Sequence, residues 1–271
     1  MRLSIRHTSH YRFTEPVAHG LQRLRLTPKE TQGQLILDWS MTYEGAQLEL
    51  EYDDQNFNRC TLVSVLPGTQ EVIVHCEGLV ETSDIAGVIG WHSGHLPLWA
   101  FLGQTDRTRP GPKMRSLAAS VRRPDGDTLA MLHDLSAAII GEVRYETGAT
   151  HVHTAAEEAV AEGQGVCQDH AHIFIGAARL LDVPARYVSG YLMMDDRIEQ
   201  EATHAWAEAH VDGLGWVGFD ISNGISPDTR YVRVATGRDY GEAAPITGIS
   251  FGAAEEELRV ALTVEQQAVE Q

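Results

Sequence analysis

One cysteine stands where the sequence predicts a tight turn into a buried helix. The segment GQGVCQDHAH (163–172) follows a short predicted helix over 154–161, which Gly163 ends. Residues 173–181 are apolar around most of a helical circumference, and such helices are normally buried. Cys167 would then lie in the first helical turn, where backbone amides without intrahelical partners favour the nucleophilic thiolate. The alternative is a small buried apolar side chain, which describes most free cysteines.

Two later segments supply the other groups that cysteine chemistry needs. His204 begins a predicted strand in THAWAEAHV (203–211), and Asp220 ends the next one in GWVGFD (215–220). A nucleophile, a base and a residue that orients the base, each on its own rigid element, is the pattern of a catalytic triad. Cys167 would attack the carbonyl carbon of an amide. His204 would hold the thiol proton and deliver it to the leaving amine, while Asp220 would fix the imidazole tautomer.

The turn between these two strands decides whether the base and its orienting residue can meet. A three-residue loop centred on Asp212 would place His204 opposite Asp220, on the same face of the sheet. A two-residue loop at Gly213 and Leu214 would place them on opposite faces, because a one-residue shift in register flips every side chain. We therefore expect the longer loop or a bulge.

The blocks around these residues resemble the transglutaminase-like superfamily of papain-fold cysteine enzymes. They are GVCQDHAH (165–172), PARYVSGYL (184–192), THAWAEAHV (203–211) and GWVGFDISNG (215–224). The N-terminal part is similar to the β-rich domain of bacterial members, and the tail at 237–248 also fits that group. The resemblance implies a papain-like core in which the helix bearing the cysteine packs on an antiparallel sheet, with Cys167, His204 and Asp220 as the triad.

The sequence departs from the transglutaminases next to the proposed nucleophile. In those enzymes a glutamine usually precedes the cysteine and a tryptophan follows it, whereas this chain has Val166 and Gln168. The acyl acceptor depends on pocket shape and water exclusion. We favour water, which makes the protein a peptidase or amidase, with transfer to an amine as the alternative. An alternative of another class is a non-catalytic binding module on the same fold.

The oxyanion of an acyl-transfer reaction needs hydrogen-bond donors. The backbone amide of Cys167 is the natural first donor, because it lies at a helix start. Gln164 is the first candidate for the second donor, and Gln168 and the hydroxyl of Tyr145 are the others. Gln164 could equally be a loop residue that bonds its own backbone.

Two further residues belong to the candidate site because they lie close to the base and its partner in sequence. Trp206 would shield the hydrogen bond between His204 and Asp220 from water, or simply pack in the core. Asn223 would cap the loop after Asp220 or contact the substrate.

The remaining sequence predicts an α+β protein of two parts. Period-two alternation with frequent turns predicts an N-terminal antiparallel β-sandwich with strands over 3–13, 21–26, 35–41, 48–52, 59–66 and 71–80. Residues 82–125 look irregular. Beyond them, apolar residues at helical spacing predict a helix over 127–143 that Asp127 caps. Further strands are expected at 183–194, 231–234 and 246–264. We divide the chain into a β-rich domain with its linker, 1–110, and a catalytic core, 111–271.

Composition and charge restrict the partners and the compartment. The 271 residues carry a formal net charge of −17, which disfavours nucleic acid and anionic membranes and leaves a peptide or protein as the expected partner. The N-terminus lacks the apolar run of a signal peptide. Three cysteines (Cys60, Cys76 and Cys167) are too few for a disulfide framework, so we expect a reducing cytoplasm.

Histidine pairs raise a metal hypothesis that the sequence otherwise does not support. There are 13 histidines, and His151 with His153 and His170 with His172 have plausible pair spacing. Residues two apart do not share a face of a helix, which weakens the second pair. No CxxC or HExxH pattern is present. We expect no metal and no cofactor, and a metal-dependent hydrolase is the minor alternative.

Overall fold

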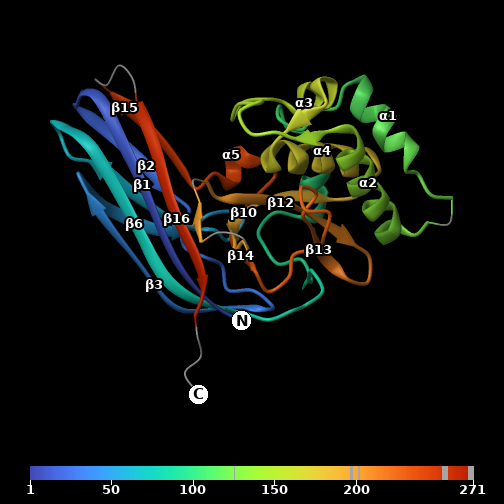
Figure 1. Ribbon diagram of the computed structural model, residues 1–271, viewed down its shortest axis with the longest axis horizontal. Coiled ribbons are helices and arrows are strands. Elements are labelled where there is room, and N and C mark those ends of the chain that lie inside the picture. Colours follow the sequence, from blue (N-terminus) through green and yellow to red (C-terminus); the bar gives the residue numbers. More distant parts are fainter. Residues whose placement is uncertain (125, 196–197, 201, 252–255, 268–271) are drawn as a thin grey trace.

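The protein has two lobes that lie side by side (Figure 1). The computed structural model describes residues 1–124, 126–195, 198–200, 202–251 and 256–267. One lobe contains only strands, and the other packs helices over a sheet. This is the predicted α+β architecture, a β-sandwich followed by a papain-like core.

The sandwich consists of two antiparallel sheets. The first has the order β11-β16-β1-β6-β3. Its strands are β11 (Glu199–Gln200), β16 (Glu256–Gln266), β1 (Arg2–Val17), β6 (Thr69–Thr82) and β3 (Gln34–Glu44). The second has the order β15-β2-β5-β4. Its strands are β15 (Ile246–Phe251), β2 (His19–Leu24), β5 (Arg59–Val65) and β4 (Ala46–Asp53). Alternate residues of the facing strands fill the core between the sheets, among them Tyr11, Phe13, Val63, Val72 and Val74.

The chain returns to the sandwich at its C-terminal end, which the boundary at residue 110 did not foresee. Strand β16 pairs with β1 from Leu3 opposite Gln266 to Phe13 opposite Glu256. Strand β15 pairs with β2. Strands β15 and β16 therefore complete the two sheets of the sandwich, although the predicted core included them. Sequence alternation predicts a strand but not its neighbour, because pairing across more than 200 residues leaves no local signal.

The second lobe is built on a sheet with the order β14-β10-β12-β13-β7. Its strands are β14 (Tyr231–Gly237), β10 (Ala185–Leu192), β12 (His204–Val211), β13 (Gly215–Phe219) and β7 (Val88–Gly90). Helices cover one face: α1 (Pro112–Ser120), α2 (Thr128–Glu142), α3 (Ala156–Glu162), α4 (Cys167–Leu180) and the short α5 (Tyr240–Ala243). Alanines at 205, 207 and 209 of β12 belong to the core beneath α4, where small side chains let a helix approach a sheet closely.

Helix boundaries follow the predicted signals. Helix α2 begins after Asp127, whose side chain accepts a hydrogen bond from the backbone of Ala130 at 3.0 Å. Helix α3 ends at Gly163, which adopts the left-handed conformation with φ +70°. A two-stranded parallel ladder of β8 (Arg144–Tyr145) and β9 (Gln164–Gly165) then leads into α4.

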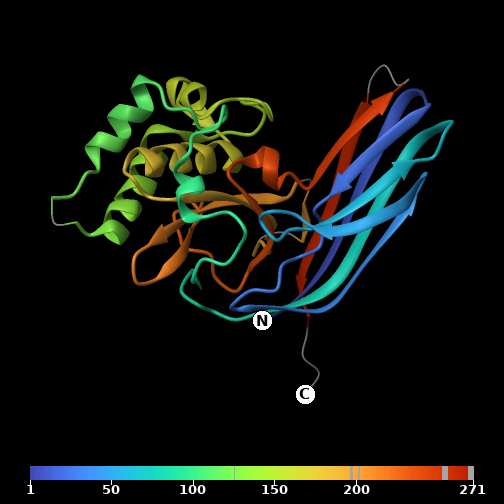
Figure 2. The same ribbon diagram turned by 180° about the vertical axis from the view of Figure 1, so that it is seen from behind.

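The segment that connects β6 to α1 packs as part of the core lobe. It crosses from β6 to α1 (Figure 2) and contains β7 and a 3₁₀ turn, η1 (Leu98–Leu102). Phe101 of that turn is buried, with its ring centroid 5.2 Å from that of Trp216. The expected irregular linker therefore supplies an edge strand and a core residue.

The two lobes share a hydrophobic core. Residues of β1, β6 and β16 pack against β10 and β14 of the core sheet, and this cluster comprises Leu3, Ile5, Val80, Leu262, Val264, Tyr191, Val232 and Val234. The Tyr191 hydroxyl also lies 2.9 Å from Nδ1 of the buried His7. Because apolar burial joins them, the lobes should unfold together. Among the described residues, no helix is both long and apolar enough to cross a membrane.

Truncating Leu262 should reveal how much β16 contributes to this fold. Leu262 is 1% exposed and Leu258, on the same strand, is 48% exposed. Leu262→Ala should lower the free energy of unfolding by about 2–5 kcal/mol, because it leaves a cavity in the shared core. Leu258→Ala should change it by less than about 0.5 kcal/mol. Urea unfolding of both variants measures the difference, and equal effects would contradict the pairing of β16 with β1.

Candidate active site

Cys167 is held at the start of α4 by a buried carboxylate. Oδ2 of Asp169 accepts hydrogen bonds from the backbone of Val166 at 2.8 Å and from the Thr150 hydroxyl at 2.6 Å. A Cβ at Gly165 would lie 2.8 Å from the Cβ of Asp169, so only glycine fits there. The negative charge of this carboxylate also stabilises the partial positive charge at the N-terminus of α4. This tight turn places Cys167 at the first position of the helix, as the sequence predicts.

The strand register brings His204 and Asp220 to the same face. Strands β12 and β13 pair Val211 with Gly215 and Ala207 with Phe219. The loop therefore has three residues, as expected, but it is centred on Gly213 and not on Asp212. His204 is consequently diagonal to Asp220 instead of directly opposite. The two side chains still meet, with His204 Nε2 and Asp220 Oδ2 2.7 Å apart.

Asp220 is the centre of a buried hydrogen-bond network. Its carboxylate is fully buried, and Oδ2 accepts hydrogen bonds from the Tyr231 hydroxyl at 2.6 Å and from Asn223 Nδ2 at 2.7 Å. Tyr231 was not identified from the sequence as a site residue. It begins β14, and nothing in its local pattern indicates that β14 lies close to the end of β13. The hydrogen bond from Asn223 to Asp220 agrees with the expectation that Asn223 caps the loop after Asp220.

Burial and hydrogen bonding oppose each other at His204. Burial by itself would lower the pKa of this histidine, but hydrogen bonds with Asp220 and Cys167, and the charges of both, raise it to about 10. At Asp220 burial would raise the pKa, but the contacts with His204, Tyr231 and Asn223 keep it below its usual value. Since Nε2 faces Asp220, Nδ1 is left for the thiol. With its pKa raised to about 10, His204 is an imidazolium at neutral pH.

Two aromatic rings enclose the histidine. The ring of Trp206 lies nearly parallel to that of His204, with centroids 6.2 Å apart, and Tyr231 meets Trp206 edge to face at 5.4 Å. Trp206 is 2% exposed. Its position is consistent with both expectations for it, a water shield over the hydrogen bond and a core residue.

Cys167 and His204 open onto a cleft of about 690 Å³. Three tyrosines line it, together with smaller polar and apolar side chains: Tyr145, Tyr187, Tyr240, Thr147, Gln168, Ser189, Met194, Glu199 and Thr203. Cys167 is partly exposed, whereas Cys60 and Cys76 are buried. A substrate in this cleft would reach the thiol of Cys167 and neither of the other two.

The three candidates for a second oxyanion donor occupy different positions. Gln168 and Tyr145 line the cleft. Gln168 Nε2 already donates to the carbonyl oxygen of Val152 at 3.0 Å. Gln164 does not line the cleft. It pairs with Arg144 on the β8–β9 ladder, one residue out of phase with Tyr145, and successive strand residues point to opposite faces.

His170 and His172 make structural contacts. The two ring nitrogens of His170 lie 2.9 Å from the Ser222 hydroxyl and 3.0 Å from the carbonyl oxygen of Val143. His172 accepts a hydrogen bond from the backbone of Tyr240 at 3.1 Å, and burial lowers its pKa to about 3. In the part of the chain that the structure describes, no group of three or more His, Cys, Asp or Glu could hold a metal ion.

Two family profiles match consecutive parts of this chain. The transglutaminase-like superfamily matches residues 115–221, which contain Cys167, His204 and Asp220. The bacterial transglutaminase-like N-terminal region matches residues 3–81. The chain belongs to the transglutaminase-like superfamily and carries the bacterial type of N-terminal region. Family and fold together are those of papain-like cysteine enzymes.

Known relatives extend over the whole chain. An uncharacterized protein of Mycobacterium leprae, ML0607, is 27% identical over 282 residues, covering 97% of this chain and 98% of that protein. Rv2569c of Mycobacterium tuberculosis is 26% identical over 275 residues, or 92% and 88% of the two chains. The crystal structure of a candidate cysteine protease from Cytophaga hutchinsonii is similar with a TM-score of 0.73, 20% identity and 98% coverage of both chains. At that identity the likeness establishes the fold.

Removing the Tyr231 hydroxyl should weaken the buried aspartate network. Tyr231→Phe should lower the free energy of unfolding at pH 7 by about 1.5–3 kcal/mol, as expected for a hydrogen bond to a charged group. The folded-state pKa of Asp220 is depressed, so this stabilisation is complete above its unfolded value of 3.8 and is lost as the pH falls through the folded value.

Urea unfolding of wild type and variant between pH 7 and pH 3 measures this loss. Tyr187→Phe is the matched control, because no hydrogen bond joins the Tyr187 hydroxyl to another described residue, and it should show no such pH dependence. A Tyr231→Phe deficit that stays constant into acid would show that the hydroxyl does not stabilise the Asp220 carboxylate.

Proposed function

We propose that this protein is a cysteine hydrolase that cleaves amide or peptide bonds through Cys167, His204 and Asp220. The observation that supports this most directly is the position of His204. Its Nε2 lies 2.7 Å from Asp220, and its ring lines the same cleft of about 690 Å³ as Cys167.

The reaction would proceed by acyl transfer to sulfur. The Cys167 thiolate attacks the carbonyl carbon, and the backbone amide of Cys167 would donate a hydrogen bond to the developing oxyanion. The His204 imidazolium donates its proton to the leaving nitrogen, so that an amine departs and a thioester remains. Neutral His204 then takes a proton from water, which attacks the thioester. The carboxylic acid product leaves, and the thiolate–imidazolium pair is restored.

The buried partners of His204 would hold its imidazole in place both for proton donation to the leaving nitrogen and for proton removal from water. Because Asp220 is itself held by Tyr231 and Asn223, the imidazole cannot rotate away from Cys167 without breaking the hydrogen bond of 2.7 Å to Asp220. Fixing the ring in this way is the established role of the third group of a triad. Trp206 would keep water from competing for the same hydrogen bond.

The ionisation of Cys167 tests the pair directly. A Cys167 thiolate paired with the His204 imidazolium, as we propose, would be alkylated by iodoacetamide at nearly the same rate at pH 6 and pH 9. In His204→Ala the rate at pH 6 should fall roughly 100-fold, because an ordinary thiol is about 1% ionised or less at that pH. Peptide mapping by mass spectrometry distinguishes Cys167 from the two buried cysteines.

His133→Ala is the matched control, since His133 is exposed on α2, and it should label like wild type. Labelling of the wild type that instead rises with pH like that of an ordinary thiol, and is unchanged in His204→Ala, would overturn the proposal. It would favour the non-catalytic binding module.

The identity of the acyl acceptor can be read from the product. Incubation with a peptide library in ¹⁸O-water should place the heavy oxygen in a new carboxylate, because water attacks the thioester. Adding a primary amine should leave that product dominant, and Cys167→Ala should abolish it. Mass spectrometry detects both products. A dominant amine conjugate would instead identify the protein as a transglutaminase.

A further inference from the structure

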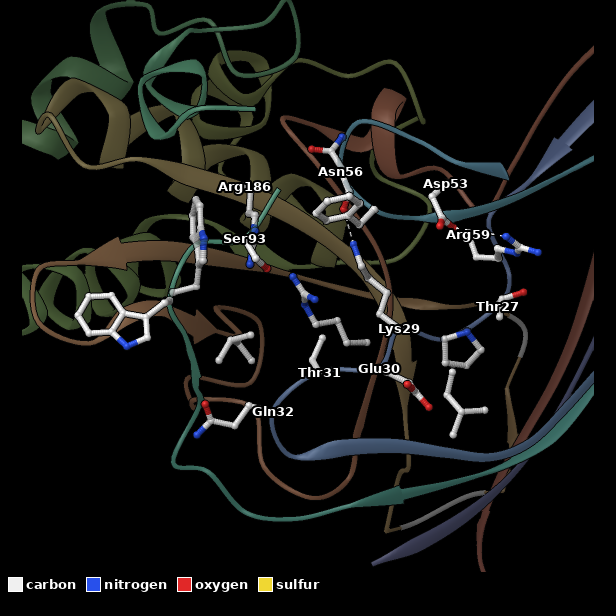
Figure 3. A pocket seen from close by; sticks show the side chains of 17 residues that line it. Thr27, Lys29, Glu30, Thr31, Gln32, Asp53, Asn56, Arg59, Ser93 and Arg186 are labelled. Carbon is white, nitrogen blue, oxygen red and sulfur yellow. Dashed lines mark hydrogen bonds and ion pairs between the residues drawn. The ribbon is translucent and has the colours of Figure 1, made fainter. Parts of the chain in front are cut away.

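A second cavity lies between the two lobes, away from the cysteine. Its volume is about 600 Å³, and it shares no lining residue with the cleft at Cys167. Segments 27–32, 53–59 and 89–93 form one side, and strands of the core sheet supply Arg186, Trp216 and Arg233 (Figure 3). Ligand sites often occur at such junctions between domains.

Two arginines in this cavity share one buried carboxylate. Arg186 Nε lies 2.6 Å from Glu208, and Arg233 makes contacts of 2.6 and 3.0 Å with the same group. Burial by itself would raise the pKa of Glu208, which is 0% exposed, but the two guanidinium groups lower it to about 2. Glu208 is therefore ionised and holds both arginines in place.

Arg186 is fixed by a second contact. Its guanidinium carbon lies 3.8 Å from the ring centroid of Trp216, and Nε1 of that tryptophan donates to His92 Nδ1 at 3.1 Å. The side chains of Arg186 and Arg233 are only 8% and 7% exposed. The two arginines are thus pre-organised before any ligand arrives.

These arginines retain unused donors. Among the described residues, no acceptor is hydrogen-bonded to Nη1 or Nη2 of Arg186 or to Nη1 of Arg233. The donors belong to side chains that are more than nine-tenths buried and line the cavity. Planar guanidinium groups match carboxylate and phosphate oxygens in pairs.

A lysine lies beside the arginine pair in the same cavity. Lys29 lines the same cavity, and its amino group donates only to neutral oxygens, those of Asn56, Asn58 and Thr236. Burial, followed by the charges of Arg233 and Arg186, lowers the pKa of Lys29 well below its usual value. Four basic side chains (Lys29, Arg59, Arg186 and Arg233) and two acidic ones (Glu30 and Asp53) line the cavity, and Glu208 holds the arginine pair from beneath the surface. Buried charges are normally compensated.

We propose that this cavity binds a small organic anion through its carboxylate or phosphate group, with Arg186 and Arg233 as the principal ligands. The cavity is larger than one oxyanion group needs, and Trp91, which is 77% exposed, provides an aromatic wall for the rest of the molecule. The inference does not depend on the chemistry at Cys167.

Isothermal titration calorimetry tests the site with two probes, inorganic phosphate and succinate, each at constant ionic strength set with sodium chloride. Wild type should bind at least one of them saturably at a single site, with a Kd below about 1 mM. Phosphate alone, succinate alone, or both would each support the site and identify the group that it recognises. Absence of saturable heat with both probes would overturn it.

Two variants assign the binding to this cavity. Ser93 is exposed and lines it, so Ser93→Glu should place a competing carboxylate there and weaken binding at least about 10-fold. Arg186→Lys keeps the charge but removes the planar fork, and it should weaken binding as well. Ser116→Glu makes the same charge change on the exposed face of α1 and should leave the Kd within about twofold.

Ser93→Glu is a surface change, so it should unfold at the wild-type temperature even if Arg186→Lys destabilises the protein. Wild-type affinity in Ser93→Glu would place the ion elsewhere and refute the assignment. Equal weakening in Ser93→Glu and Ser116→Glu would refute it too, because the effect would then be one of overall charge.

Discussion

The buried carboxylate of Asp220 is the constraint on which the site depends. An ionised carboxylate without water is costly unless donors surround it. Here the donors come from three places: His204 at the start of β12, Tyr231 at the start of β14, and Asn223 in the loop after β13. All three elements must be correctly placed before Asp220 is satisfied. The same requirement fixes the imidazole that faces Cys167, so that folding of the sheet and assembly of the site are one event.

Strand β12 carries two charge centres on one face. His204, Trp206 and Glu208 alternate along it, while the alanines between them face α4. His204 serves the cleft at the thiol, and Glu208 holds the arginine pair at the second cavity. Trp206 lies between them on the strand, and its buried apolar ring separates the two charged groups. The loops of the sandwich cover this face, so the N-terminal lobe shapes the enzyme core instead of merely preceding it.

Local sequence was informative wherever a short-range interaction decides the structure. The glycine turn before Cys167 and the cap at Asp127 follow from nearby residues, whereas the three-residue loop between β12 and β13 was expected because His204 and Asp220 must share a face. The partners that lie far along the chain could not be predicted in this way. Tyr231 reaches Asp220 only because β14 lies beside β10 in the sheet, and β16 joins β1 across most of the chain. The centre of the loop was also missed by one residue, which moved His204 from opposite Asp220 to diagonal.

The sequence by itself determined the candidate site residues and the order of the parts: a cysteine at a helix start, a histidine and an aspartate on successive strands, and a sandwich ahead of them. These features depend on residue type and on periodicities of two and 3.6, which each segment carries in itself. Only the tertiary structure decided which groups surround the aspartate, that β15 and β16 complete the sheets of the first lobe, and that Arg186 and Arg233 share one carboxylate. Such contacts arise from the packing of distant segments. Burial makes an unpaired charge costly, so each buried charge is paired with a group from another segment.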